Sequence, residues 1–225
     1  MTSKNDKYLN LILYVTGFLA IILTPAGARL ISPLLDWVGY GAMEGFFDEL
    51  FTSIIWVVEI IIIALFCKKK FNRNILINSE TKGMELPVRR ILIISGIIVA
   101  CILIISAQIG FQVKPFYDLG EKFNGYELLN NVGIFLRNIV KCVWIVVMMR
   151  AAQDFIEQIS GRGNSRLPYA GLVMLMTVGL YDIVMGINNL AVTYLFLYLI
   201  YGWIYILTDR SMIKTYLLVV LIYLF

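Results

Sequence analysis

The sequence contains no histidine, and it holds few cysteines among its 225 residues. Without histidine the chain lacks the commonest metal ligand and the commonest general base at neutral pH. The cysteines Cys67, Cys101 and Cys142 lie in or beside apolar segments, with no C-x-x-C spacing. We therefore interpret them as buried thiols rather than disulfides or metal ligands, and we expect no metal and no cofactor.

Charge is also scarce. Charged residues make up 15% of the chain and hydrophobic residues 60%, with a mean hydropathy of +0.83. An ordinary soluble domain has about 25% charged and about 45–50% apolar residues. The net charge of +4 does not indicate nucleic-acid binding, because the basic residues cluster in loops between apolar runs. We predict a single integral membrane domain over residues 1–225.

Seven apolar runs follow one another along the chain. They lack the apolar/polar alternation of barrel strands, and a helix satisfies its own backbone hydrogen bonds in lipid. The sequence therefore predicts an all-α polytopic bundle of six to seven spans. The last run has 14 residues, fewer than the roughly 20 of a spanning helix, so it either stops within the membrane or belongs to a truncated chain. The predicted runs are 8–23, 51–67, 91–113, 128–149, 167–187, 190–207 and 212–225.

Two boundaries need interpretation. The motif Ala26-Gly27-Ala28 after the first run resembles a signal-peptidase site, but we expect an uncleaved span because many spans follow. The stretch 31–50 is only partly apolar, and we expect an interfacial or partly re-entrant segment outside the membrane. Its acidic residues are Asp36, Glu44, Asp48 and Glu49.

The distribution of lysine and arginine predicts the orientation, because these residues favour cytoplasmic loops. A cytoplasmic N-terminus leaves Arg29, Lys114 and Lys122 on the opposite side. We expect a plasma-membrane protein, and the richness in Lys, Asn and Ile suggests a bacterial source. The cytoplasmic set is Lys4, Lys7, Lys68, Lys69, Lys70, Arg73, Lys82, Arg89, Arg90, Arg150, Arg162, Arg166, Arg210 and Lys214.

Four ionisable residues fall within the predicted spans: Glu59, Arg137, Lys141 and Asp182. Each would cost at least ~2.5–3.5 kcal/mol if it faced lipid unpaired, so we expect them inside the bundle. Arg137 and Lys141 share a helix face, and the two acids are their predicted partners. The group is either an ion-paired clamp, a polar cavity for a ligand, or a catalytic site.

A second group of charges lies at the cytoplasmic end of the fourth span. Asp154 and Glu157 are either a solvated helix face or, if neighbours bury one of them, an acid–base pair. The basic cluster that follows the second span is a topology anchor, with binding of anionic lipid as the second interpretation. This cluster is Lys68, Lys69, Lys70 and Arg73.

Three stretches resemble the CPBP family, also called the Abi or type II CAAX protease-like family. Residues 151–158, AAQDFIEQ, stand where that family carries paired glutamates and then an arginine. Residues 178–182, VGLYD, stand where it has a run ending in a catalytic histidine. Residues 194–208 are similar to the helix before its last motif. The resemblance implies the family's helical fold with a cavity in the membrane.

The chain departs from the family pattern at each catalytic position. Gln153-Asp154 replaces Glu-Glu, Asp182 replaces the first histidine, and the last helix offers Leu218-Val219 and Tyr223 where histidine and asparagine belong. The family's glutamates and histidines activate water for peptide cleavage, and this chain has no histidine. Asp154, Glu157 and Asp182 are therefore candidates for a residual site in a pseudo-protease.

We consider three functions. The first is a non-catalytic regulatory, scaffolding or immunity-type protein that binds a membrane protein, hydrophobic peptide or lipid, since the family is linked to bacteriocin self-immunity and control of envelope proteins. The second is an intramembrane peptidase using Asp154 with Asp182 or Glu157. The third is the membrane subunit of a small-molecule transporter. Small and polar residues of the third span would recognise a partner, namely Ser95, Gly96, Ser106 and Gly110.

Overall fold

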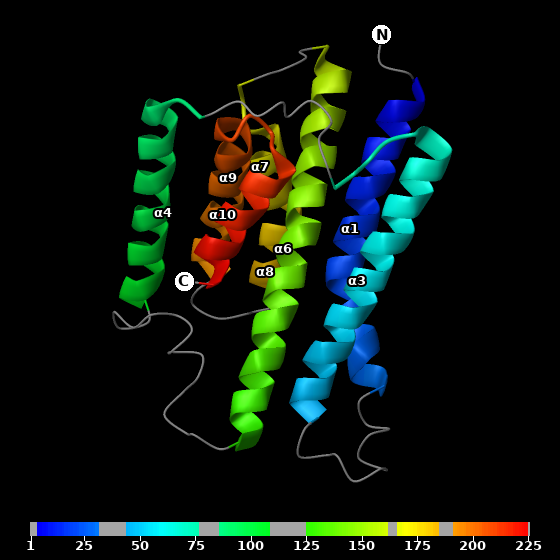
Figure 1. Cartoon of the computed structure of the whole chain (residues 1–225), viewed down its shortest axis with the longest axis vertical. Coiled ribbons are helices and arrows are strands. Elements are labelled where there is room, and N and C mark those ends of the chain that lie inside the picture. Colours follow the sequence, from blue (N-terminus) through cyan, green and yellow to red (C-terminus); the bar gives the residue numbers. More distant parts are fainter. Residues whose placement is uncertain are drawn as a thin grey trace.

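The computed structural model describes residues 4–31, 44–76, 86–108, 125–161, 166–184 and 191–224, and every regular element in these ranges is helical. The prediction of an all-α protein is therefore confirmed for the described chain. The elements are α1 (Lys4–Ile31), α3 (Glu44–Phe71), α4 (Val88–Gln108), α6 (Gly125–Ser160), α7 (Tyr169–Met174), the π-helix η2 (Leu175–Gly179), α8 (Leu180–Val184), α9 (Ala191–Leu207) and α10 (Met212–Leu224) (Figure 1).

Four of these helices are long and apolar enough to cross a membrane, which supports a membrane protein. They contain the apolar segments Asp6–Leu30, Gly45–Phe71, Val88–Gln108 and Leu128–Ser160. The continuous stretch α7–η2–α8 and the helices α9 and α10 are shorter. The 17 residues of α9 reach about 26 Å at about 1.5 Å per residue, less than the roughly 30 Å of a hydrocarbon core. The predicted six to seven spans and the orientation stay predictions.

Helix α6 organises the bundle. It has 36 residues and packs against α1 and α3 on one side and against α7 and α10 on the other (Figure 1). Helix α4 lies outermost and packs on α9 and α10. An Arg90–Asp209 ion pair and a 2.5 Å hydrogen bond from Gln108 to Thr193 hold it there. The short helices accompany α6 along only part of its length.

Glycines allow α7 and α9 to pack closely. A Cβ on Gly202 of α9 would lie 2.5 Å from the backbone nitrogen of Gly171 in α7, and a Cβ on Gly171 would lie 2.8 Å from the carbonyl oxygen of Leu199. Neither backbone can move aside as a side chain could. The two helices therefore pack backbone to backbone where α7 begins.

Several helices extend beyond the predicted apolar runs. Helix α1 continues through Pro25 to Ile31, past the predicted end at residue 23, and α3 begins at Glu44, within the segment expected to be interfacial. Helix α6 continues to Ser160 and so includes the helix end predicted to carry Asp154 and Glu157. The carboxylate of Glu49, in the second turn of α3, meets Arg137 of α6 at 2.7 Å. Asp36 and Gly110 lie outside the described residues.

Candidate functional site

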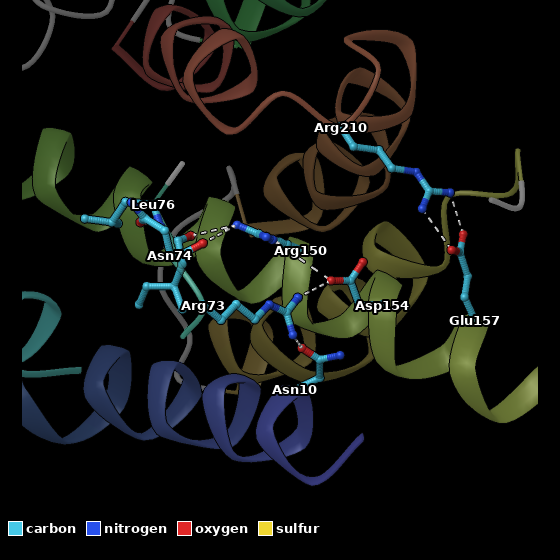
Figure 2. A network of polar contacts seen from close by, with 9 residues as sticks. Asn10, Arg73, Asn74, Leu76, Arg150, Asp154, Glu157 and Arg210 are labelled. Atoms are coloured by element: carbon cyan, nitrogen blue, oxygen red, sulfur yellow. Dashed lines mark hydrogen bonds and ion pairs between the residues drawn. The ribbon is translucent and has the colours of Figure 1, made fainter. Parts of the chain in front are cut away.

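The basic end of the bundle carries a polar network centred on α6, where Arg73 makes the first link. Asn72, with a φ of 49°, turns the chain out of α3. The Arg73 guanidinium then donates to Asp154 Oδ2 at 2.6 Å and to Asn10 Oδ1 at 2.7 Å (Figure 2). One side chain thus joins the segment after α3 to both α1 and α6.

Arg150 makes the second link. Its Nη1 donates to the backbone carbonyl oxygens of Asn74 at 3.1 Å and Ile75 at 3.2 Å, and its Nε lies 4.0 Å from Asp154 Oδ2. Asn74 Oδ1 in turn accepts a hydrogen bond from the Leu76 amide at 3.0 Å. Asp154 therefore lies between two guanidinium groups that fix the chain after α3 (Figure 2).

Glu157 has an arginine from a different part of the chain. Arg210, in the turn between α9 and α10, donates to both of its carboxylate oxygens at 2.8 and 2.6 Å (Figure 2). The Glu157 side chain is 7% exposed. Burial by itself lowers the pKa of Arg210, but the hydrogen bonds and negative charge of Glu157 outweigh burial and raise that pKa above its usual value. The pair is bidentate, the strong geometry for arginine and carboxylate.

Gln153 connects this pair to α7. The buried amide donates to Glu157 Oε1 at 2.7 Å and to the Leu167 carbonyl at 3.0 Å, and its oxygen accepts from the Ala170 amide at 3.0 Å. An ionised glutamate could accept but not donate here. The amide of Gln153 therefore has a structural use that an ionised glutamate could not fulfil.

The structure separates Asp182 from the other two candidate catalytic carboxylates. Because Ala170 bonds Gln153 and α7 runs antiparallel to α6, the twelve residues from 170 to 182 carry Asp182 about 18 Å along the bundle from Asp154. Asp182 instead accepts a 2.9 Å hydrogen bond from Tyr198. Asp154 and Glu157 are neighbours, but each forms an ion pair with an arginine. A general base needs an open lone pair, and arginines already contact both carboxylates.

Asp182 and Lys141 lie in one polar cluster halfway along α6. Lys141 Nζ donates to Tyr223 Oη at 3.2 Å, lies 5.5 Å from the centroid of the same ring, and is subject to the charge of Asp182. The two residues do not form an ion pair, although they were predicted partners. The π-helix η2 ends three residues before Asp182, and π-helical turns often occur at functional sites.

The predicted pairing of Glu59 with Arg137 or Lys141 is wrong. Arg137 pairs with Glu49, whereas Glu59 accepts a 3.1 Å hydrogen bond from Thr24 of α1. Glu59 lies ten residues, nearly three turns, further along α3 than Glu49, so it is out of reach of Arg137. Its Oε2 is buried and has no hydrogen-bond partner in the described chain.

The basic cluster after α3 divides into two parts. Lys68, Lys69 and Lys70 are exposed, which suits an anchor or a contact with anionic lipid, but Arg73 is turned inward to Asp154. Its grouping with the lysines as a lipid contact does not fit this position. Cys67, Cys101 and Cys142 are buried and not joined in disulfides, as predicted.

Sequence reasoning missed Asn10, Gln153 and Arg210 as members of the network. A polar amide inside an apolar run was a usable signal at Asn10, which is fully buried. Nothing local distinguishes Arg210, whose partner is 53 residues away. Its role depends on the turn between α9 and α10 reaching the end of α6.

Comparison of the chain with protein-family models, with curated proteins and with solved structures finds no match. The resemblance to the CPBP family stays a prediction.

Proposed function

We propose that the protein is a non-catalytic membrane scaffold that binds a transmembrane helix of a partner protein. The single observation that carries this proposal is the occupation of Asp154 and Glu157, the acids at the predicted peptidase position, by Arg73 and Arg210. Such pairs hold helices together, and removing one partner leaves a poorly solvated charge. The network therefore suits a frame that keeps the bundle's shape, in line with a family-like fold that has lost its catalysis.

The outer face of α4 supports the partner that we propose. Ile94, Ile98, Cys101 and Ile105 form its buried face, whereas Ser95, Gly96 and Ala100 are exposed. A Cβ added to Gly96 would meet no atom within 4 Å. Exposed small residues four apart allow the backbone of a second membrane helix to approach closely, and α4 is 21 residues long, which matches a bilayer.

Site-specific photo-crosslinking in native membranes tests this function. A photoreactive residue at Ala100 should give one adduct of defined mass, and Gly96→Leu should abolish it by keeping the partner helix away. The matched control places the photoreactive residue at Ile62, an exposed position of α3, where we expect only a lipid background. An adduct of twice the protein's mass identifies a second copy as the occupant. An Ala100 adduct that Gly96→Leu leaves unchanged contradicts the proposal.

The mid-bundle cluster favours transport as a second candidate function. Lys141, Asp182 and Tyr198 are polar groups at the depth where a membrane transporter binds its substrate or coupling ion. If the protein is a transporter subunit, Lys141→Met should abolish uptake of its substrate without changing the amount of protein in the membrane. Equal function of Lys141→Met and the wild type would count against transport.

A further inference from the structure

A polar recess lies at the end of the bundle opposite the arginine network. It has a volume of about 230 Å³ and is formed by the end of α1, the start of α3 and the lower part of α6. This is below the roughly 300–1,000 Å³ of pockets for drug-sized ligands, so the recess suits a small molecule. Its lining residues are Pro25, Arg29, Gly45, Asp48, Glu49, Thr52, Asn130 and Arg137.

The acids and the arginines come from different helices. Asp48 and Glu49 belong to α3, whereas Arg29 belongs to α1 and Arg137 to α6. The four charges sum to zero, so a ligand with both signs preserves neutrality and a bare cation does not. The recess therefore has one acidic wall and two basic walls, an arrangement that matches a zwitterion.

The acidic wall of the recess contains a hydrogen-bond acceptor without a donor, on Asp48. Its Oδ1 is buried, lies in the lining of the recess and has no hydrogen-bond partner in the described chain. A buried acceptor without a donor is destabilising. Glu59 Oε2 and Asn138 Oδ1 are also unmatched in the described chain, but Asp48 Oδ1 is the one that lines this recess. The neighbouring Glu49 is already paired with Arg137. Asp48 is thus the carboxylate of the recess that lacks a donor.

The basic wall of the recess contains unused hydrogen-bond donors, on Arg137. A guanidinium carries five N–H donors, and the hydrogen bond from Arg137 Nη1 to Glu49 Oε1 uses one of them. The remaining donors can hold a carboxylate or phosphate in the same recess, since arginine binds either group through paired N–H donors.

We propose that this recess binds a small zwitterion, with its primary ammonium group donating to Asp48 and its carboxylate or phosphate accepting from Arg137. Both a free amino acid and the phosphoethanolamine headgroup of a lipid have this chemistry. The site is independent of the partner face on α4, so either proposal can fail while the other holds.

Ligand-dependent unfolding of the purified full-length protein in detergent is the first test. Phosphoethanolamine should raise the unfolding temperature, whereas phosphocholine, which has the same phosphate but no N–H donor, should bind at least tenfold more weakly. Asp48→Asn should lower the affinity for phosphoethanolamine at least tenfold. Asp6→Asn, at the other end of α1, is the matched control and should leave the affinity unchanged.

A second variant guards against misfolding of Asp48→Asn. Gly45→Ala changes no charge, but its methyl group would lie 2.9 Å from Asn130 Oδ1 at the wall of the recess. It should weaken phosphoethanolamine binding severalfold in a stable protein. Equal binding of phosphoethanolamine and phosphocholine, or full affinity in both variants, would overturn the proposal.

Reconstitution distinguishes the two sources of the ligand. If the natural ligand is a lipid headgroup, nanodiscs of phosphatidylethanolamine should stabilise the wild type above nanodiscs of phosphatidylcholine, and Asp48→Asn should remove the difference. If it is a free solute, β-alanine should stabilise the wild type in phosphatidylcholine nanodiscs, again through Asp48. Absence of stabilisation by either probe would refute zwitterion binding.

Discussion

The acidic residues at the two ends of the bundle differ in their hydrogen-bond partners. At the basic end Asp154 and Glu157 each meet an arginine at 2.6 Å, and further hydrogen bonds join their surroundings to α1, to α7 and to the segment after α3. At the opposite end Glu49 is paired, but Asp48 beside it keeps a buried oxygen without a hydrogen bond in the described chain. The network at the basic end joins several helices, although its Asn10 Nδ2 is buried without a hydrogen-bond partner in the described chain. The unmatched oxygen of Asp48 differs because it lines a recess that can hold a ligand.

The comparison predicts the largest loss of stability at Arg73. Arg73→Met removes the donor to both Asp154 and Asn10, and the carboxylate stays in a site where its side chain is 23% exposed. Breaking a buried pair costs more than losing a surface one, so we expect the free energy of unfolding to fall by about 2–3 kcal/mol. Thermal unfolding in detergent measures it. An unchanged unfolding temperature would show that the network is not structural.

A double-mutant cycle tests the link between Glu157 and Arg210. Glu157→Gln and Arg210→Met should each lower the free energy of unfolding by about 1.5–3 kcal/mol, because each leaves the other charge without its bidentate partner. The double variant should lose less than the sum of the single losses. Additive losses would mean that the pair does not act as a unit.

We expect a glycine-to-alanine substitution to cost more stability at the basic end of the bundle than at the recess. Gly202→Ala places a methyl group against the backbone of Gly171, so we expect a loss of about 1–3 kcal/mol. Gly45→Ala meets the amide of Asn130, a movable side-chain end, and should cost less than about 1 kcal/mol. Unfolding temperatures of the two variants measure the difference. Equal losses would contradict a tight basic end and an adaptable recess.

The smallest effect on stability should come from the exposed lysines after α3. Replacement of Lys68, Lys69 and Lys70 by glutamine should leave the unfolding temperature unchanged, because these side chains are exposed. It should weaken association with anionic lipid by about 1 kcal/mol per lysine, measured as lipid retained through purification. A marked loss of stability would show that the lysines, like Arg73, belong to the internal network.

The sequence predicted the helices better than their contacts. Apolar runs long enough for a bilayer and the absence of strand alternation sufficed for an all-helical membrane protein, because these properties depend on neighbouring residues along one chain segment. The start of α3 at Glu44 and the continuation of α1 through Pro25 to Ile31 were missed, whereas the extension of the fourth helix as far as Glu157 was predicted.

For the charged residues, too, the sequence predicted their location but not their contacts. The positions of the apolar runs in the sequence determined that Glu59, Arg137, Lys141 and Asp182 fall in apolar segments. They did not determine the partners of these residues. Counting acids against bases paired Arg137 with Glu59 or Asp182, whereas the packing of α3 on α6 pairs it with Glu49 and leaves Glu59 with Thr24. Hydropathy is a property of one segment, but the partner of a charge is decided by the register of two helices, which only the tertiary structure specifies.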